Sequence, residues 1–493
     1  MMALDEQGRT ACKAKRDEED FDCQVPSDSN VKQKSLTRRG CIPVLVVSAF
    51  IAAAVLVPLV SYGSNSNEYF MPTDDKCQQP CTCSYELVES IPENLTFPDG
   101  SVRTRSTFDG WMSLFNEAEK SLDMTAFYWS LRGVDSGYED PSDWQGEETF
   151  KMLKTVGARV KMRIAENAEK NGSAESLELQ NAGLAKVRSL NMTRWFGSGV
   201  LHTKMWVVDD RAFYIGSANM DWRSLTQVKE LGLLARDCSC LAEDLQKIFD
   251  VYWHMGASPR TQVPQFWPLR LRTKYNADNP MTVTMNGIKS LAYISSSPPA
   301  FSPKGREDDI EAILSVIRGA KKFIHIAVMD YAPTTLFMWP HNRYWPVIDD
   351  ALRAAAFERR IQIRFMCSKW KHTKHAMYSY LKSLDALNGG FWHDNQRIQI
   401  KLFEVPIYDP HQAQIPYARV NHNKYMVTDE AAYIGTSNWS GDYFISTGGI
   451  ALVVRNVPAE EGGDSNADEE GVPAQLNAIF ERDWNSTYAH PLY

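Results

Sequence analysis

The chain has 493 residues, of which 44% are hydrophobic and 23% are charged, and its formal net charge is −8. This length is enough for two or three domains with a sizeable core. The negative balance excludes a protein that coats nucleic acid through a broad basic surface, because such binding needs many cations facing the phosphates. An enzyme that holds one or two phosphates locally is still allowed.

The amino-terminal region predicts a membrane anchor. Residues 1–40 are polar and rich in charge, which predicts a disordered cytosolic tail. Within residues 41–62, the stretch IPVLVVSAFIAAAVLVPLV carries no charge and is long enough to cross a bilayer as one helix. Basic residues precede this stretch and none lies in the ten residues after it, so the positive-inside rule predicts a type II membrane protein. A buried core helix is the alternative.

Residues 63–84 are expected to form a luminal stalk that contains cysteines. In an oxidising lumen, the groups CQQPCTC and CSC predict disulfides between the stalk and the loop near Cys238. Closely spaced thiolates also suit zinc, which is the alternative. The candidates for disulfides are Cys77, Cys81, Cys83, Cys238, Cys240 and Cys367. Sequons predict glycans at Asn94, Asn171, Asn191 and Asn485, whereas the sequon at Asn438 lies inside a repeated motif and is expected to stay unmodified.

The remaining chain consists of two similar halves. FDGWMSLFNEAEKSLDMTAFYWSL and, about two hundred residues later, DDIEAILSVIRGAKKFIHIAVMDYAPT both predict a helix followed by a strand. A second helix and strand follow in each half. These patterns predict an α/β fold with two lobes, residues 85–255 and 306–493, each a sheet flanked by helices. A connector rich in Pro, Ser and Asn, residues 256–305, joins them.

Each half contains one copy of the same motif, HTKMWVVDDRAFYIGSAN at 202–219 and HNKYMVTDEAAYIGTSN at 422–438. Side chains two apart on a strand leave the same face, so the His and the Lys of each copy lie together. An imidazole, a cation and an amide donor suit a phosphate ester: His attacks or moves protons, and Lys and Asn hold the oxygens. If the lobes pack face to face, two histidines flank one phosphorus atom at a shared active site. The residues are His202, Lys204, Asn219, His422, Lys424 and Asn438.

Other residues near the motifs have weaker assignments. Asp209 and Asp429 complete the two copies, and we interpret both as structural residues that cap a turn or pair with a buried cation. Ser217 and Ser437 either assist in phosphate binding or are small residues of a tight turn. Aromatic residues at matching strand ends would stack on unpaired bases if they lined the cleft, although core positions are the preferred interpretation; they are Tyr128, Trp129 and Tyr331.

The two motifs resemble the paired H-K-D signatures of the phospholipase D superfamily. The stretches GSANMDWRSLTQVKELG and VNHNKYMVTDEAAYIGTSNWSGDYF are similar to its membrane-anchored members three and four, more to member three. The resemblance implies a lysosomal protein, delivered through the endoplasmic reticulum and Golgi and released by proteolysis as a soluble luminal form. It implies a homodimer with 5′→3′ exonuclease activity on single-stranded DNA and RNA, without a metal or other cofactor. Transphosphatidylation of glycerophospholipids by the same site is the alternative, and an inactive luminal binding protein is the third hypothesis.

This resemblance also suggests individual roles. His202 is expected to be the nucleophile that forms a phosphohistidine, and His422 the proton donor. Glu230 occupies the place where superfamily members often hold a carboxylate against the nucleophilic imidazole, whereas the second half has Gly449 there. A salt bridge from Glu230 to Lys229 or Arg223 is the alternative. Relatives pair the cysteine that matches Cys367 with one near the carboxyl terminus; this chain lacks it, so Cys367 is expected to be free or bonded elsewhere, for example to Cys83.

Overall fold

The computed structural model describes residues 81–168, 173–257, 262–338, 340–391, 397–457 and 471–493. All of them belong to one unit of the chain, Asp75–Tyr493. The expected tail, the expected membrane helix at 41–62, Cys77 and Asn171 lie outside the described residues. Within the part of the chain that is described, every helix is too short or too polar to span a bilayer.

The first half contains one mixed sheet. Its strand order is β1–β10–β8–β7–β3–β5–β6, in which β3, β5 and β6 run parallel and the other neighbours pair antiparallel. The strands are β1 (Cys81–Ser90), β3 (Ser121–Ala126), β5 (Lys161–Asn167), β6 (Lys186–Leu190), β7 (Met205–Val208), β8 (Ala212–Gly216) and β10 (Glu230–Arg236). The main helices are α2 (Thr107–Asn116), α4 (Trp144–Gly157), α5 (Ala174–Asn181) and α8 (Ser239–Met255), with the short α7 (Trp222–Thr226) before β10.

The second half repeats this order. Its sheet runs β12–β19–β18–β17–β14–β15–β16, with the same parallel and antiparallel neighbours, and β20 (Ala489–Pro491) extends it beyond β16. The strands are β12 (Ile288–Ser297), β14 (Phe323–Val328), β15 (Gln362–Ser368), β16 (Ile398–Phe403), β17 (Lys424–Thr428), β18 (Ala432–Gly435) and β19 (Gly449–Asn456). The helices are α9 (Asp309–Gly319), α10 (Val347–Glu358), α11 (His375–Asp385), α12 (Gly441–Ile445) and α14 (Val472–Trp484). The predicted α/β fold is confirmed, and β12, the counterpart of β1, lies within the segment expected as a connector.

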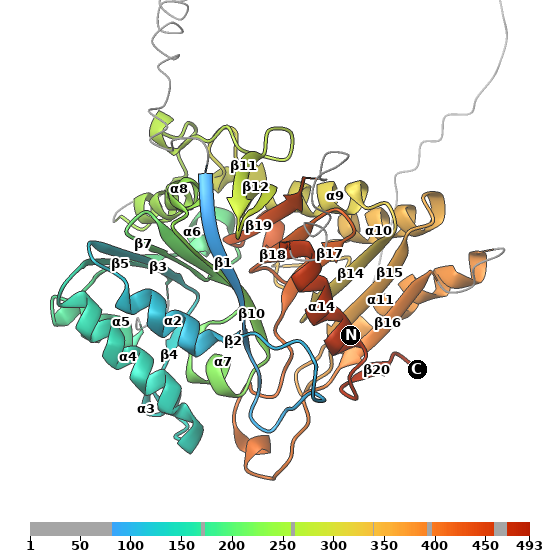
Figure 1. The fold of residues 1–493 in the computed structure, drawn as a ribbon, viewed down its shortest axis with the longest axis horizontal. Coiled ribbons are helices and arrows are strands. Elements are labelled where there is room, and N and C mark those ends of the chain that lie inside the picture. The colour runs from blue at the N-terminus through green and yellow to red at the C-terminus, as the bar shows by residue number, and fades with distance from the viewer. Residues whose placement is uncertain (1–80, 169–172, 258–261, 339, 392–396, 458–470) are drawn as a thin grey trace, which may run out of the picture. The chain divides into compact units, whose positions relative to one another are not determined.

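Strand β1 belongs to both sheets, as Figure 1 shows between the blue-to-green and the yellow-to-red elements. It pairs antiparallel with β10, and Cys81–Cys83 pair in parallel with β11 (Met281–Met285). Two disulfides, Cys81–Cys240 and Cys83–Cys238, attach β1 to the start of α8. The predicted link between the two cysteine groups is confirmed. Cys367 is buried and free, which is the first of the two alternatives expected for it, and Cys83 is bonded to Cys238 instead.

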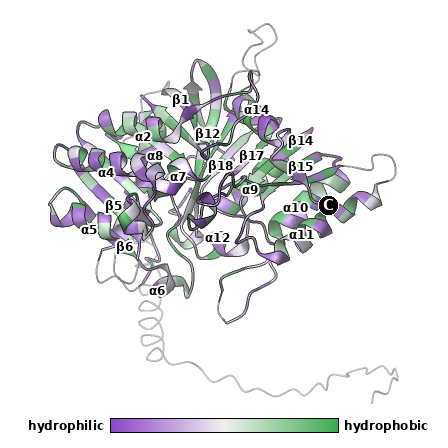
Figure 2. Cartoon of the chain, turned by 90° about the horizontal axis from the view of Figure 1, so that it is seen from below, coloured by the Kyte–Doolittle hydropathy of each residue, from purple (hydrophilic) through white to green (hydrophobic). Residues whose placement is uncertain are grey.

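The two halves share a hydrophobic core. Ile215 and Leu233 of the first sheet are buried in one cluster with Ile434 and Leu452 of the second. Helix α8 buries one face in this cluster because Leu241, Leu245, Ile248 and Tyr252 recur at a spacing of three or four residues. Figure 2 shows the resulting mixture of purple and green residues on the covering helices. Three predicted glycan acceptors, Asn94, Asn191 and Asn485, are exposed, whereas Asn438 is buried.

Candidate active site

Each histidine of the motif is held by a strand-like contact with the opposite half of the chain. Leu201 pairs in parallel with Gly448, and the His202 N–H donates a hydrogen bond to the Gly448 carbonyl at 2.8 Å. In the same manner Lys229 pairs with Asn421, and the His422 N–H donates to the Lys229 carbonyl at 2.8 Å. The two histidines are therefore positioned by backbone bonds that cross between the halves.

The two imidazoles have different partners. Nδ1 of His202 lies 2.9 Å from the carbonyl oxygen of Thr436. Since a carbonyl can only accept, Nδ1 carries the proton and Nε2 of neutral His202 presents a lone pair. Nδ1 of His422 lies 2.9 and 3.0 Å from the two carboxylate oxygens of Glu230. The expected contact between Glu230 and His202 was wrong: Glu230 opens β10, and the pairing of Lys229 with Asn421 directs its carboxylate toward His422. Glu230 therefore no longer supports His202 as the nucleophile, and the roles of the two histidines must rest on their other surroundings.

The electrostatics of the two histidines also differ. Burial lowers the pKa of His202 well below its ordinary value of 6.5, and the positive charges of Lys204 and Lys424 lower it further. Burial lowers the pKa of His422 as well, but the carboxylate of Glu230 acts in the opposite direction and favours the protonated ring. His202 is therefore the more readily neutral imidazole and His422 the more readily protonated one.

Both histidines open into one cavity of about 460 Å³. His202, His422, Asn219, Asn438 and Glu230 line it, so the structure brings together the predicted imidazoles and amides of both motifs. Asn219 Nδ2 donates to the Tyr128 hydroxyl at 3.4 Å, and Asn438 Nδ2 donates to the Tyr443 hydroxyl at 3.1 Å. These residues surround a space in which a phosphate group would meet two imidazoles and two amides.

The two lysines of the motifs lie behind the histidines rather than on the cavity wall. Lys204 and Lys424 are buried, and each Nζ donates to the carbonyl of the histidine two residues before it, at 2.5 and 2.7 Å. Burial lowers the pKa of Lys424 more than the nearby carboxylates of Glu230 and Asp330 raise it, and the net result is a pKa of about 7. Both lysines lie close enough to His202 for their positive charges to lower its pKa, so they contribute a positive potential next to the cavity.

The two motif aspartates lie at the far end of their hairpins and away from the cavity. The Asp209 carboxylate accepts the backbone N–H groups of Glu119, Lys120 and Ser121 at 2.7–2.8 Å. The Asp429 carboxylate accepts the three corresponding N–H groups of residues 321–323. These contacts agree with the structural interpretation of both residues.

The two serines of the motifs, Ser217 and Ser437, are not placed to bind a phosphate in the cavity. Ser217 Oγ exchanges hydrogen bonds with the backbone of Leu231 and closes the strand end, and neither serine is among the residues that line the cavity. Ser437 is fully buried, and its Oγ has no hydrogen-bond partner among the described residues. Of the aromatic candidates, Tyr128 lines the cavity, whereas Trp129 and Tyr331 are buried in the hydrophobic clusters of the two halves.

Several cavity residues were not predicted. Met329 and Asp330 directly follow β14, just as Phe127 and Tyr128, in that order, follow β3. That correspondence within the repeat is a signal that points to Asp330, whose pKa burial raises. Further lining residues that no sequence pattern indicated include Phe337, Trp370 and Tyr417.

Comparison with known proteins identifies relatives that match most of the chain. The family model described as PLD3/4, PLD-like domain, matches residues 101–407. A protein of Xenopus laevis named 5′-3′ exonuclease PLD3 is 46% identical over 448 residues, which is 90% of this chain and 88% of that protein. The human protein of the same name is 44% identical over 459 residues, 92% of this chain and 90% of its own. A Caenorhabditis elegans protein named probable phospholipase D F09G2.8 is 41% identical over 466 residues, 93% of this chain and 78% of its own.

Proposed function

The chain belongs to the PLD3/4 family of PLD-like proteins, and on this premise we propose that it is a phosphodiesterase that removes nucleotides from the 5′ end of single-stranded DNA or RNA. The names of its relatives support the direction of cleavage. The observation that carries the proposal is the unlike environment of the two imidazoles at one cavity. Thr436 leaves Nε2 of His202 free to attack, and Glu230 favours a proton on His422.

The proposed reaction has two steps. Nε2 of His202 attacks the phosphorus in line, the bond to the leaving oxygen breaks, and Nε2–H of His422 gives its proton to that oxygen. Neutral His422 then takes a proton from water, whose oxygen attacks the phosphorus and displaces His202. Asn219 and Asn438 donate hydrogen bonds to the non-bridging oxygens, and Lys204 and Lys424 offset their charge.

Removal of one histidine at a time tests these roles. With a thymidine p-nitrophenyl phosphodiester, the leaving group departs without an acid, so His422→Ala should release one burst of nitrophenol and then stall. Mass spectrometry should find the nucleotide on His202. His202→Ala should show neither burst nor adduct. A burst in His202→Ala with the adduct on His422 would reverse the two roles.

A labelled oligonucleotide tests the activity itself. Single-stranded DNA labelled at its 3′ end should shorten stepwise from the 5′ end at acidic pH, and both alanine variants should lose turnover by a factor of about 10² to 10⁴ or more. Excess chelator should leave the rate unchanged. A wild-type protein that leaves the oligonucleotide intact but exchanges the head groups of glycerophospholipids would favour transphosphatidylation, since the same two histidines serve either phosphodiester.

A further inference from the structure

A second cavity lies next to the catalytic one. Its volume is about 490 Å³, and its walls are residues 369–372, which follow β15, and the long segment between β16 and β17. Trp370 and Tyr417 line both cavities. A chain that leaves the catalytic cavity past these two rings therefore enters the second cavity directly.

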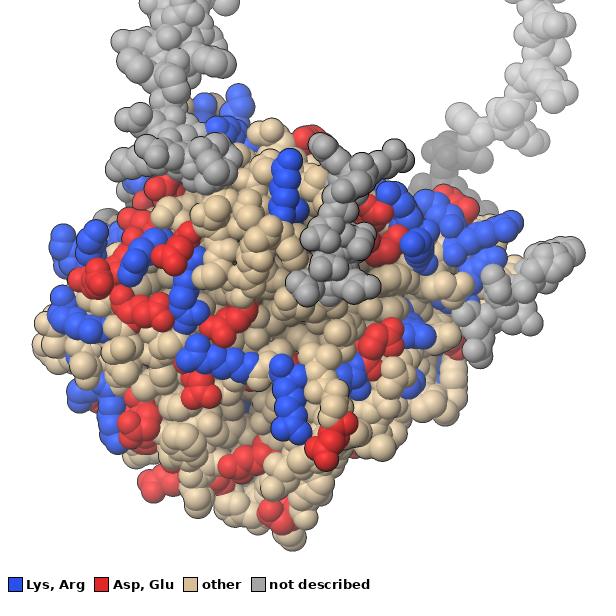
Figure 3. Space-filling model, in the orientation of Figure 1, with Lys and Arg blue, Asp and Glu red and all other residues tan. Residues whose placement is uncertain are grey.

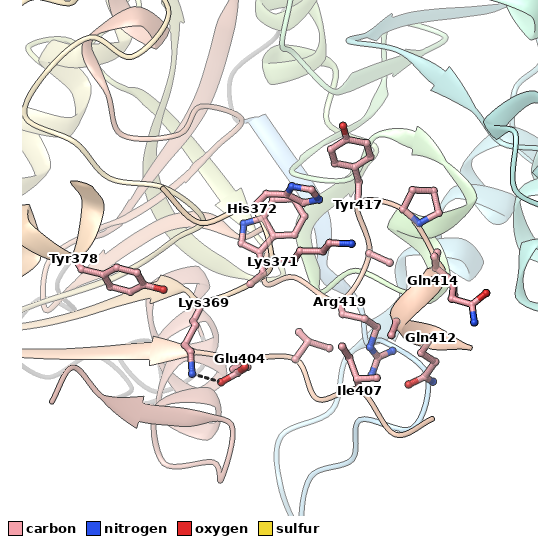
Figure 4. A pocket seen from close by; sticks show the side chains of 16 residues that line it. Lys369, Lys371, His372, Tyr378, Glu404, Ile407, Gln412, Gln414, Tyr417 and Arg419 are labelled. Atoms are coloured by element: carbon pink, nitrogen blue, oxygen red, sulfur yellow. Dashed lines mark hydrogen bonds and ion pairs between the residues drawn. The ribbon is translucent and has the colours of Figure 1, made fainter. Parts of the chain in front are cut away.

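The second cavity carries an excess of positive charge. Lys369, Lys371 and Arg419 line it, against one acidic residue, Glu404. Glu404 pairs with Lys369 at 2.8 Å, whereas exposed Lys371 extends across the cavity without an ion-pair partner among the described residues (Figure 4). The whole chain is acidic, and basic and acidic side chains are interspersed on the face shown in Figure 3. An unpaired lysine in such a cavity is therefore a local feature, and it suits a phosphodiester backbone.

The wall shared by the two cavities is aromatic. The rings of His372 and Tyr417 stack with centroids 4.9 Å apart and planes 22° apart, and Trp370 meets His372 edge to face at 4.8 Å. Tyr417 is 64% exposed. Such a ridge of ring faces beside a cation is the combination by which proteins hold unpaired bases without reading their sequence.

The backbone that presents this ridge is fixed before any ligand binds. Tyr417 and Arg419 both have a positive φ, 57° and 55°. Arg419 donates to the carbonyl of Pro406 and to Oε1 of Gln227, while Arg223 donates to the carbonyl of Pro416. These bonds anchor the segment to the first half of the chain, so little ordering is required of it when a ligand arrives.

We propose that this second cavity holds the nucleotides that lie downstream of the scissile phosphate, with bases on the ridge of Trp370, His372 and Tyr417 and a phosphate on Lys371. The inference rests on the proposed exonuclease function and extends it. The terminal nucleotide occupies the catalytic cavity, and the following ones cross the ridge. The consequence is a rate that depends on what lies downstream of the scissile phosphate: an oligonucleotide reaches the second cavity, whereas a thymidine p-nitrophenyl phosphodiester has no downstream nucleotide and does not.

The double variant Lys371→Glu/His372→Ala tests this inference, since neither residue lines the catalytic cavity. For a single-stranded oligonucleotide of about twelve residues, kcat/KM should fall about tenfold, the effect of losing one stacked base or one phosphate contact. The slope of log kcat/KM against log salt should become shallower by about 0.7 for each lost contact. The rate for the thymidine p-nitrophenyl phosphodiester, which has no nucleotide downstream of the scissile phosphate, should stay within about twofold of wild type.

Lys289→Glu is the matched control, because Lys289 is exposed on β12 and lines neither cavity. Equal losses for the control and the double variant, or no loss on the long substrate, would overturn the inference. Equal losses on the oligonucleotide and on the thymidine p-nitrophenyl phosphodiester would show that these residues support the catalytic cavity instead. A loss confined to phosphatidylglycerol vesicles would assign the cavity to lipid. A wild-type protein inactive on all nucleotide substrates would instead refute the proposed function.

Discussion

At the scale of single residues, Glu230 makes the two histidines of the site different from each other. Its carboxylate contacts Nδ1 of His422, whereas among the described residues the partner of His202 Nδ1 is the carbonyl of Thr436. A negative partner stabilises an imidazolium, whereas a carbonyl only orients a ring. In the proposed reaction, Glu230 therefore gives His422 the charge preference of the acid that His202 lacks.

Replacement of Glu230 by glutamine should move the pH–rate profile. The proposed reaction needs protonated His422, so kcat/KM falls as pH rises through the pKa of His422, which burial places below 6.5. Glu230 raises that pKa, and Glu230→Gln removes the charge while keeping an oxygen near Nδ1. The falling limb should shift to lower pH, and activity near neutral pH should decline more than activity in acid. Profiles of kcat/KM between about pH 4 and pH 8 measure this; an unchanged limb would remove His422 as the acid.

Asp209 offers the opposite case, a motif residue whose loss should affect stability and leave chemistry intact. Its carboxylate accepts three backbone N–H groups at the start of β3, and its φ of 53° is one that asparagine tolerates. Asp209→Asn should lower the free energy of unfolding by about 1–2 kcal/mol, because a charged acceptor of three backbone N–H groups is replaced by a neutral amide with one acceptor oxygen. Urea denaturation measures the loss, and kcat within about twofold of wild type is expected. A loss of kcat as large as that of His202→Ala would place Asp209 in the reaction.

At the scale of elements, a buried charge cluster ties the two halves together behind the active site. Lys229, just before β10, contacts Glu89 of β1 at 3.0 Å and Asp483 of α14 at 2.7 Å, and Arg482 contacts both acids. All four side chains are buried. Since Lys229 also pairs with Asn421 next to His422, the cluster supports the crossing at which Glu230 meets that histidine.

Removal of the Lys229 charge should lower the stability of the fold. Lys229→Met leaves two buried carboxylates with one cation, so the free energy of unfolding should drop by about 3–5 kcal/mol. Burial alone would raise the pKa of Glu89, but Lys229 and Arg482 outweigh it and lower that pKa to about 2. A lowered pKa means that the contribution of Glu89 is complete above its unfolded pKa and is lost only as pH falls toward 2. The difference between Lys229→Met and wild type in urea should therefore persist at pH 5, with exposed Lys289→Met as control; a difference below 1 kcal/mol would contradict it.

The sequence predicted features that are local along the chain, but not contacts that depend on how distant elements pair. Helix and strand order and the paired cysteines followed from periodicity and composition, because both are local along the chain. The partner of Glu230 did not, since it depends on the pairing of Lys229 with Asn421 across the two halves. Strand alternation placed His202 beside Lys204, but whether a side chain reaches the cavity or lies behind it depends on packing. No sequence pattern indicated that Tyr417 lines the cavity.

At the scale of the whole molecule, neither half has a complete site. Backbone bonds from Gly448 to His202 and from Lys229 to His422 cross between the halves, and the cores merge around Ile215 and Ile434. The duplicated fold supplies two copies of one motif, and the crossing gives the copies unlike partners. The asymmetric chemistry proposed above therefore requires the assembled pair of halves.

The unit Asp75–Tyr493 contains both motifs, both cavities and both disulfides, which leads to a prediction about truncation. A chain that begins at Asp75 should keep kcat/KM on an oligonucleotide within about twofold of the full chain, because every residue of the proposed mechanism lies inside this unit.

A chain that begins at Val88 should lose both activity and cooperative unfolding. It lacks Cys81 and Cys83 and most of β1, which pairs with strands of both sheets. Disulfide removal alone costs about 2–5 kcal/mol, so Cys81→Ser/Cys240→Ser should lie between the two truncations in urea resistance. If the chain from Val88 folded cooperatively and cleaved oligonucleotides, the two halves would be held together by their shared core alone, and β1 would be dispensable to the active site.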